Sequence, residues 1–111
     1  MDKLAALSKL DLNLVIAFLA IHREENLTRA AKVLGVGQPA MSATLNRLRG
    51  LFDEPLFIRI NKGMRPTEGG DKLAATLAPM VESLTDALLQ QITRKAHTVD
   101  HSSDHSFTKQ S

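Results

Sequence analysis

The interruption Gly-Val-Gly at residues 35–37, between two short helical patterns, constrains the fold more than any other feature of the chain. The first pattern keeps its small apolar residues at one-face spacing from Ala30 to Leu34, and Gly35 follows where a helix C-cap favours a left-handed residue. A second pattern restarts at once with Pro39, which suits a first helical turn because its missing N–H would have no intrahelical partner there. The sequence therefore predicts two helices joined by a tight turn.

The second of these helices divides into an apolar and a polar side. Its apolar stripe has spacings of four, three and four residues: Met41, Leu45, Leu48 and Phe52. At about 100° per residue, the opposite side carries Pro39, Ala43, Asn46 and Arg47, flanked by Ser42 and Arg49. A short helix, a tight turn and a second helix that offers its polar side describe a helix-turn-helix. The arginines and small polar residues suit a DNA major groove.

Capping residues mark the starts of three helices. Asp11 suits the N-cap of a helix that ends near Glu25, and Thr28 is expected to cap the first helix of the helix-turn-helix. Thr67 is expected to cap a long helix in the last third of the chain. Glu68 favours the same start because an acidic side chain is stabilised at the positive end of a helix.

Between the second helix and the long helix the pattern changes to that of a strand. From Leu56 to Ile60 the residues alternate, with Leu56, Ile58 and Ile60 on one side and Phe57 and Arg59 on the other. "NKG" reads as a hairpin tip and "MRPT" as the returning edge, where a proline is tolerated. Such a two-stranded wing would carry Lys62 and Arg65 towards phosphates or a narrow minor groove.

The long helix carries a second apolar stripe with spacings of four, three and four residues, here called the pairing stripe: Leu77, Val81, Leu84 and Leu88. This spacing is typical of paired helices. We favour dimerisation through it, the alternative being that the stripe folds back on its own core. Pro79 lies inside the helix and predicts a kink or a weak point, because it removes one helical hydrogen bond.

Charge is concentrated in the middle of the chain. Residues 28–65 hold seven basic and two acidic residues, a balance of +5 in a chain of net charge +2. This favours a surface for a polyanion, although an ordinary solvated face gives the same count.

Cysteine is absent, and neither a phosphate-binding loop nor a nucleophile beside a base is found, so an enzyme is not expected. No apolar run is long enough to span a membrane, so a soluble cytoplasmic protein is expected, and DNA binding would place it at the nucleoid.

From Arg94 onward the apolar periodicity stops and a polar tail rich in Ser, His and Asp is expected to be disordered. His97, His101 and His105 recur every four residues, as ligands on one helix face would. The segment lacks apolar support for a helix, so we expect no metal site and no cofactor. Residues 1–66 are thus expected to form the binding domain, 67–93 the linker and pairing helix, and 94–111 the tail.

The stretch from Leu10 to Leu73 closely resembles the N-terminal DNA-binding region of LysR-type transcriptional regulators. In it, "LTRAAKVLGVGQPAMS" corresponds to the helix-turn-helix, "LFIR" to the first wing strand, and "GMRPTEGG" to the return into the linker helix. The wording "LNRLRGLFDEPLF" resembles the branch that contains nodulation and aromatic-catabolism regulators. The resemblance implies a mainly α-helical winged helix-turn-helix with a three-helix core.

The resemblance also implies roles for individual residues. The implied DNA-binding residues are Thr28, Gln38, Pro39, Ala40, Ser42, Ala43, Asn46, Arg47, Arg59, Lys62 and Arg65. Thr28 and Gln38 would hold the DNA backbone, and the next residues would enter the groove. Ala43 departs from the family, which often has Arg or Gln there, although an alanine can still contact a thymine methyl.

The expected function is therefore sequence-specific binding of double-stranded DNA and regulation of transcription, by a homodimer paired through the linker helix. Family members continue into a larger two-lobed effector-binding domain, whereas this sequence ends after the polar tail. A small-molecule inducer is accordingly not expected. The alternative is a protein-interaction module that forms mixed dimers with a full-length LysR-type relative.

Overall fold

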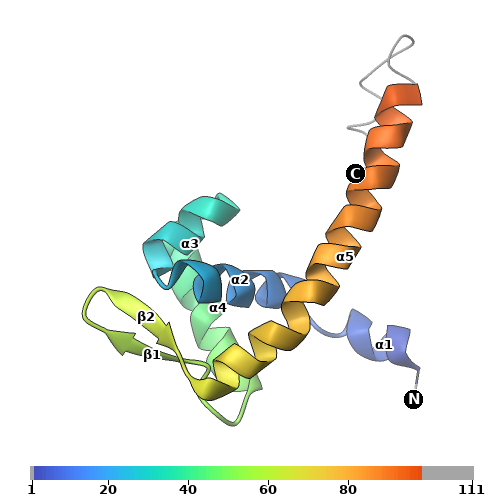
Figure 1. The fold of residues 1–111 in the computed structure, drawn as a ribbon. Helices are drawn as coiled ribbons and strands as arrows, with labels where there is room; N and C mark the ends of the chain where they lie inside the picture. Colours follow the sequence, from blue (N-terminus) through green and yellow to red (C-terminus); the bar gives the residue numbers. More distant parts are fainter. Residues whose placement is uncertain (1, 99–111) are drawn as a thin grey trace. The chain divides into compact units, whose positions relative to one another are not determined.

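The computed structural model of the protein describes residues 2–98, with side chains described as far as Arg94. The chain divides into two compact units, residues 1–78 and 79–111. The first unit holds four helices, a hairpin and the beginning of a long helix (Figure 1). The second unit continues that helix. The core and the candidate site both lie in the first unit.

The first three helices are α1 (Lys3–Ser8), α2 (Leu12–Glu24) and α3 (Leu27–Leu34). The prediction of a helix capped by Asp11 is confirmed for α2, since the Asn13 amide donates to its carboxylate at 3.0 Å. Helix α1 was not expected from the sequence. It is too short to show an apolar period, and it buries none of its residues.

Helix α3 begins earlier than expected, and the prediction that Thr28 caps it is wrong. The cap is Asn26, whose side-chain oxygen accepts from the Arg29 amide at 2.8 Å. The reason lies at the end of α2, where Glu25 takes a left-handed conformation with φ of 51°. This residue reverses the chain so sharply that α3 follows after a single extended residue, with Leu27 buried as its first residue.

The predicted tight turn between α3 and α4 (Gln38–Leu51) is confirmed. Gly35 is the C-cap of α3 and is left-handed, with φ of 68°. Pro39 lies in the first turn of α4. The apolar stripe of α4 is buried at its first three positions, but Phe52 lies outside the helix and is 39% exposed. The predicted stripe therefore does not extend to Phe52 on the helix, because the chain becomes extended there and leaves the helical period.

Strands β1 (Phe57–Ile60) and β2 (Gly63–Pro66) form the expected antiparallel hairpin, with Phe57 opposite Pro66 and Ile60 opposite Gly63. The alternation predicted the strand but left open which side of β1 faces the core. Phe57 is buried, whereas Ile58 is 47% exposed. The side of Phe57 faces the helices because its ring packs on the ring of Phe18 in α2, with centroids 5.5 Å apart.

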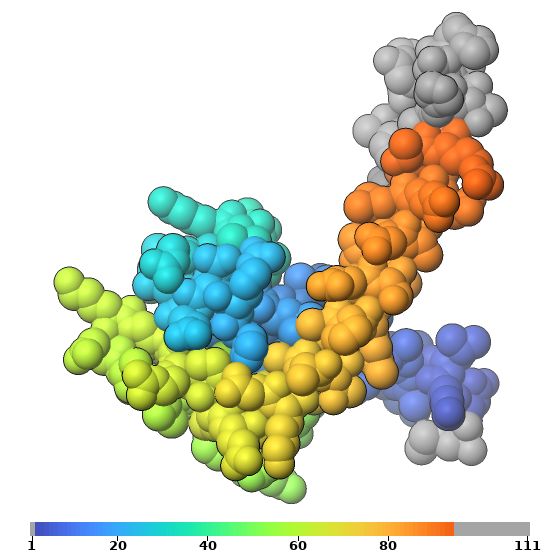
Figure 2. All heavy atoms as spheres, in the orientation of Figure 1, coloured from blue at the N-terminus to red at the C-terminus, as the bar shows by residue number. Residues whose placement is uncertain are grey.

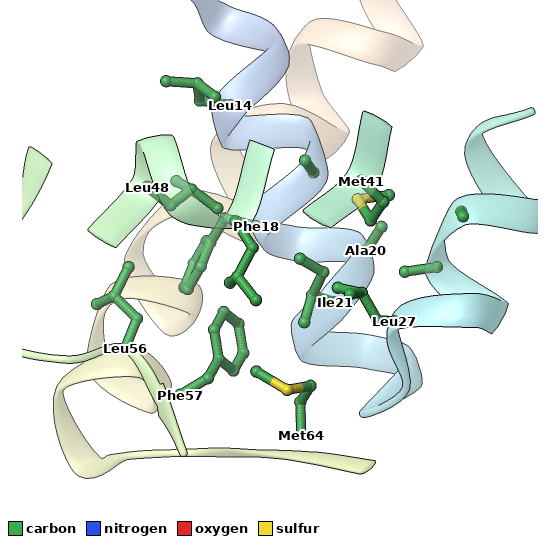
Figure 3. Packing of buried hydrophobic residues seen from close by; sticks show 14 of the residues in the cluster. Leu14, Phe18, Ala20, Ile21, Leu27, Met41, Leu48, Leu56, Phe57 and Met64 are labelled. Carbon is green, nitrogen blue, oxygen red and sulfur yellow. The ribbon is translucent and has the colours of Figure 1, made fainter. Parts of the chain in front are cut away.

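The core of the first unit lies between α2, α3, α4 and the hairpin (Figure 3). Phe18, Ile21, Met41 and Met64 are the largest fully buried side chains. They come from α2, α4 and β2, so this cluster fixes the hairpin and α4 to one scaffold. Small residues of α3, including Ala30 and Ala31, are also buried and allow close helix approach.

The long helix α5 (Glu68–Thr98) starts at the expected cap. The Gly70 amide donates to the Thr67 hydroxyl at 3.0 Å, and that hydroxyl donates to the Pro55 carbonyl at 2.7 Å. The helix continues past Pro79 and past residue 93 to Thr98, although a non-helical tail was expected from Arg94. The remainder of that tail, with His101 and His105, lies outside the described residues.

Candidate nucleic-acid interface

The two helices of the helix-turn-helix are joined by a side-chain contact across their first turns. The Thr28 hydroxyl donates to the side-chain oxygen of Gln38 at 3.0 Å, and both residues are exposed. Thr28 is available for this contact because Asn26, and not Thr28, caps α3. The structure thus brings Thr28 and Gln38 together, the two residues that were expected from the sequence to hold the DNA backbone.

The outer side of α4 is nearly free of long side chains over its first two turns. Pro39, Ala40 and Ala43 are exposed, and Ser42 is half-buried. No acidic residue lies in the first turn of α4, and the Gly37 N-cap gives no side-chain hydrogen bond to its amides. This end of the helix therefore offers methyl groups, one hydroxyl and the partial positive charge of a helix N-terminus, which attracts anions.

Arg47 lies further along α4 and is partnered within the same unit. Its guanidinium donates to the Asp11 carboxylate at 3.0 Å and so links α4 to the start of α2. The Asn13 backbone amide and the Arg47 guanidinium lower the pKa of Asp11 below its ordinary value. Sequence reasoning assigned Asp11 a capping role and Arg47 a groove role, and it missed that the two residues are paired.

The hairpin presents its cations to solvent. Arg59, Lys62 and Arg65 are all exposed, and among residues 2–94 none of the three forms an ion pair. The hairpin stands out from the helical body of the unit, as Figure 2 shows. Three cations on one projecting element can approach a phosphate backbone without first releasing an acidic partner.

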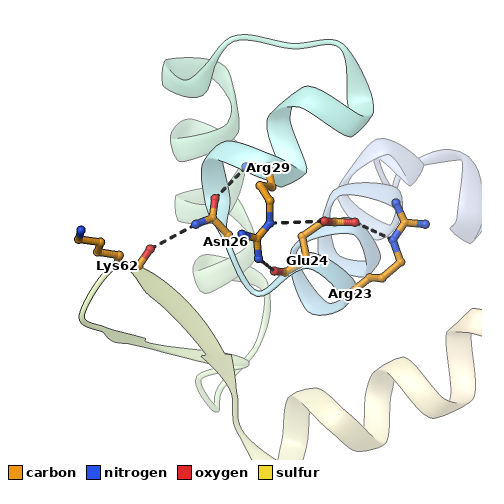
Figure 4. A network of polar contacts seen from close by, with 5 residues as sticks. All are labelled: Arg23, Glu24, Asn26, Arg29 and Lys62. Carbon is orange, nitrogen blue, oxygen red and sulfur yellow. Dashed lines mark hydrogen bonds and ion pairs between the residues drawn. The ribbon is translucent and has the colours of Figure 1, made fainter.

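Two residues of the turn between α2 and α3 hold the hairpin, Glu25 through its backbone and Asn26 through its side chain. The Met64 amide donates to the Glu25 carbonyl at 3.0 Å, and the Asn26 side-chain amide donates to the Lys62 carbonyl at 3.4 Å (Figure 4). Neither Glu25 nor Asn26 was identified from the sequence as a residue of the site. An Asn before a helix predicts a cap, but nothing in its sequence neighbours indicates a contact with residue 62.

The residues of the pairing stripe differ in how far they are buried. Leu77 lies in the first unit, where it packs against the core and lines an apolar groove of about 260 Å³ together with Leu14 and Phe18. Leu84 and Leu88 lie in the second unit, and each is 53% exposed. The prediction that the stripe mediates dimerisation remains untested by a single chain.

His22 joins α2 to the first turns of α5. Its ring nitrogen lies 2.8 Å from the Asp71 carboxylate, and its ring packs on Phe18 with centroids 6.1 Å apart. This agrees with a structural role for the histidine.

Among the described residues, no group of three or more potential ligands is arranged to hold a metal ion, and no helix is long and apolar enough to cross a membrane.

These features define a winged helix-turn-helix domain. A family model for bacterial regulatory helix-turn-helix proteins of the LysR family matches residues 12–71, which is more than half of the chain. The chain belongs to this family. The match ends in the first turn of α5, so it includes the helix-turn-helix and the wing.

Curated relatives agree with this assignment. The chain is 41% identical over 78 residues to the HTH-type transcriptional regulator SyrM 1 of Sinorhizobium fredii, covering 70% of this chain and 23% of the relative. It is 42% identical over 87 residues to nodulation protein D 1 of Bradyrhizobium elkanii, covering 78% of this chain and 27% of the relative. The chain thus spans about a quarter of the length of these curated relatives.

Solved structures have the same fold. The probable transcriptional regulator PA0477 of Pseudomonas aeruginosa is 39% identical with a TM-score of 0.69, over 74% of this chain and 28% of that chain. The CbnR_DBD–DNA complex gives a TM-score of 0.64 over 79% of this chain and 99% of that chain. At 22% identity, this second likeness is one of fold alone.

Proposed function

We propose that the protein binds double-stranded DNA and regulates transcription as the DNA-binding part of a LysR-type regulator. The observation that carries this proposal is the combination, on one unit, of a small-residue helix surface on α4 and three wing cations that form no ion pair within residues 2–94. Relatives named as transcriptional regulators and a DNA complex of the same fold support it. Within the chain, residues 1–66 would bind DNA, 67–93 would pair, and the protein would act at the nucleoid.

The first two turns of α4 would enter the major groove. Pro39, Ala40 and Ala43 offer apolar contacts that suit the thymine methyl group, and Ser42 and Asn46 offer hydrogen bonds to base edges. Thr28 and Gln38, already joined, would hold the adjacent backbone. Arg47 would reach DNA only after exchanging Asp11 for a phosphate or a base, so its contribution includes the loss of that ion pair.

The wing would meet the neighbouring backbone or minor groove. Arg59, Lys62 and Arg65 are exposed cations, and phosphate contacts of this kind contribute affinity without reading the sequence. Two copies would pair through the stripe of α5, where Leu84 and Leu88 expose apolar surface in a single chain. A pair of domains can then read two half-sites, whereas one domain reads only one.

A second candidate function uses the same stripe. Exposed leucines do not by themselves distinguish a second copy from a full-length relative with a similar linker helix. The protein would then form mixed dimers and alter the activity of that relative. A pull-down that recovers only self-association, together with tight DNA binding by the protein alone, would count against this candidate.

The test of the main proposal is fluorescence anisotropy of labelled duplexes, one with an interrupted palindrome of the family's T…A kind and one scrambled, at several salt concentrations. We expect submicromolar binding that favours the palindrome and weakens steeply with salt, because phosphate contacts release counterions. Equal, weak binding to both duplexes would contradict an autonomous, sequence-specific reader. In that case the mixed-dimer candidate is tested next, by adding the full-length relative.

A further inference from the structure

The wing is tied to the turn between α2 and α3 by two adjacent hydrogen bonds. Glu25 accepts from the Met64 amide at 3.0 Å, and Asn26 donates from its side chain to the Lys62 carbonyl at 3.4 Å. Between these two positions, Gly63 leaves no space: a Cβ there would lie 2.8 Å from the Glu25 carbonyl oxygen. The hairpin backbone therefore lies directly against the turn.

The conformation of the turn makes its carbonyl available to the hairpin. Glu25 is left-handed and donates its own amide to Ile21 at 2.8 Å, which ends α2. The carbonyl of the preceding residue, Glu24, is taken by the Arg29 guanidinium at 2.7 Å (Figure 4). The Glu25 carbonyl thus remains for Met64, and the turn is held from both sides.

Asn26 uses both ends of its side-chain amide. Its oxygen caps α3 through the Arg29 amide at 2.8 Å, and its nitrogen donates to Lys62. One half-buried side chain therefore connects the first helix of the helix-turn-helix to the tip of the wing. Serine or aspartate would cap the helix equally well, but an ionised aspartate has no donor and the serine hydroxyl is one atom shorter than the amide that reaches Lys62.

We propose that Asn26 is a positioning residue for DNA binding: it holds the wing tip in a fixed place relative to the helix-turn-helix, so that Lys62 meets a phosphate while α4 lies in the groove. This inference rests on the proposed DNA-binding function. The physical reason is that Lys62 lies at the exposed tip of the hairpin, where it does not share the core burial of Phe57 and Met64. A wing that is already ordered loses less conformational freedom when DNA binds.

The test is Asn26→Ser, which keeps an oxygen to cap α3 and replaces the amide that donates to Lys62 with a shorter hydroxyl, without changing net charge. In amide hydrogen exchange, we expect the Met64 amide to exchange roughly tenfold faster, while the Arg29 amide stays protected. In anisotropy titrations, we expect affinity to fall roughly three- to tenfold and the salt slope to become shallower by about one.

A double-mutant cycle separates positioning from general loosening. If Asn26 acts through Lys62, Lys62→Ala should weaken binding much less in the Asn26→Ser background than in the unaltered protein. Ser42→Ala, on α4, should have the same effect in both backgrounds. Gly63→Ala is a second variant that disturbs the same contact without touching the cap of α3, and it should reproduce the fast exchange of Met64 and the shallower slope.

The possible outcomes distinguish a failure of the positioning role of Asn26 from a failure of the proposed DNA-binding function. Unchanged exchange at Met64, or additive effects of Asn26→Ser and Lys62→Ala, would overturn the positioning role alone. Absence of DNA binding by the unaltered protein would overturn the proposed function and this role with it. If Asn26→Ser lowers the melting temperature and exposes the Arg29 amide as well, the cap is its main task, and unchanged binding by Gly63→Ala would then overturn the inference.

Discussion

The apolar stripe that begins on α4 and the pairing stripe of α5 have the same spacing of four, three and four residues, yet the stripes differ in what covers them. In α4, Met41, Leu45 and Leu48 are buried by α2 and the rest of the first unit. In α5, Leu84 and Leu88 remain 53% exposed. A periodic stripe therefore identifies the apolar side of a helix but does not identify its partner.

The difference has an energetic side. Full burial of a leucine side chain is worth about 1.5–3 kcal/mol, so the α4 stripe contributes to folding of the first unit within one chain. The corresponding gain for Leu84 and Leu88 is unrealised in the single chain and is available to a partner. The following variants test this division, beginning with the largest expected effect.

Phe18→Ala should destabilise the first unit strongly. Its ring extends from α2, is fully buried and packs on Phe57 of the hairpin. Removing such a ring leaves a cavity and lowers the free energy of unfolding by about 3–5 kcal/mol. Urea unfolding, followed by circular dichroism, measures the change. Leu88→Ala is the control on the uncovered stripe, and in a dilute, unpaired sample it should cost less than about 1 kcal/mol. Comparable losses in both variants would contradict the division between the two stripes.

Leu84→Asp should abolish pairing while leaving the first unit folded. A carboxylate at this position would be buried in the interface without a partner. Sedimentation velocity measures the loss of dimer, and a melting curve checks the fold. Ser83→Asp adds the same charge at a neighbouring exposed residue and should leave the dimer in place. An intact dimer in Leu84→Asp would show that pairing does not use this stripe.

Arg65→Ala should weaken binding to all duplexes alike if the wing, as proposed, contacts phosphates, because such contacts carry no sequence information. We expect a loss of roughly threefold to tenfold and a salt slope smaller by about one, measured by anisotropy on the palindromic and scrambled duplexes. Lys9→Ala removes the same charge near the N-terminus and should change binding less. A shift in the preferred base pairs on replacing Arg65 would instead assign it a base contact.

Asp11→Asn should have the smallest effect, and the effect should depend on pH. The Asn13 amide and Arg47 lower the pKa of Asp11, so its carboxylate stabilises the fold above the ordinary pKa of 3.8. That contribution is lost as the pH falls through the lower, folded-state pKa. Asparagine still caps α2 but has no such loss. The difference in urea midpoint between the two proteins should therefore shrink below about pH 4; a constant difference would contradict this.

The sequence was most informative where one residue determines a local conformation. Asp11, Gly35 and Thr67 each cap a helix end within a few residues of their position, and the structure confirms all three caps. The same local signals predicted the hairpin and its tip. The left-handed Glu25 was not predicted, since glutamate rarely adopts this conformation, and it shifted the cap from Thr28 to Asn26.

Contacts between distant residues could not be predicted in this way. Arg47 and Asp11 are 36 residues apart, as are Asn26 and Lys62, and neither pair has a sequence spacing that indicates contact. The side of β1 that faces the core was also missed, because both sides carry an apolar residue. Phe57 is selected over Ile58 by the position of Phe18, which is a tertiary property.

Gly70 has a consequence for how freely this protein can change over evolutionary time. Its position is buried at the start of α5, and a Cβ there would lie 2.2 Å from the Leu56 carbonyl oxygen, a backbone atom that cannot turn aside. In a saturation library selected for folding, residue 70 should tolerate almost no replacement, whereas the neighbouring Gly69 has ordinary contacts and should accept alanine. Strict retention of glycine there would reflect close backbone packing, with no role for the residue in recognition.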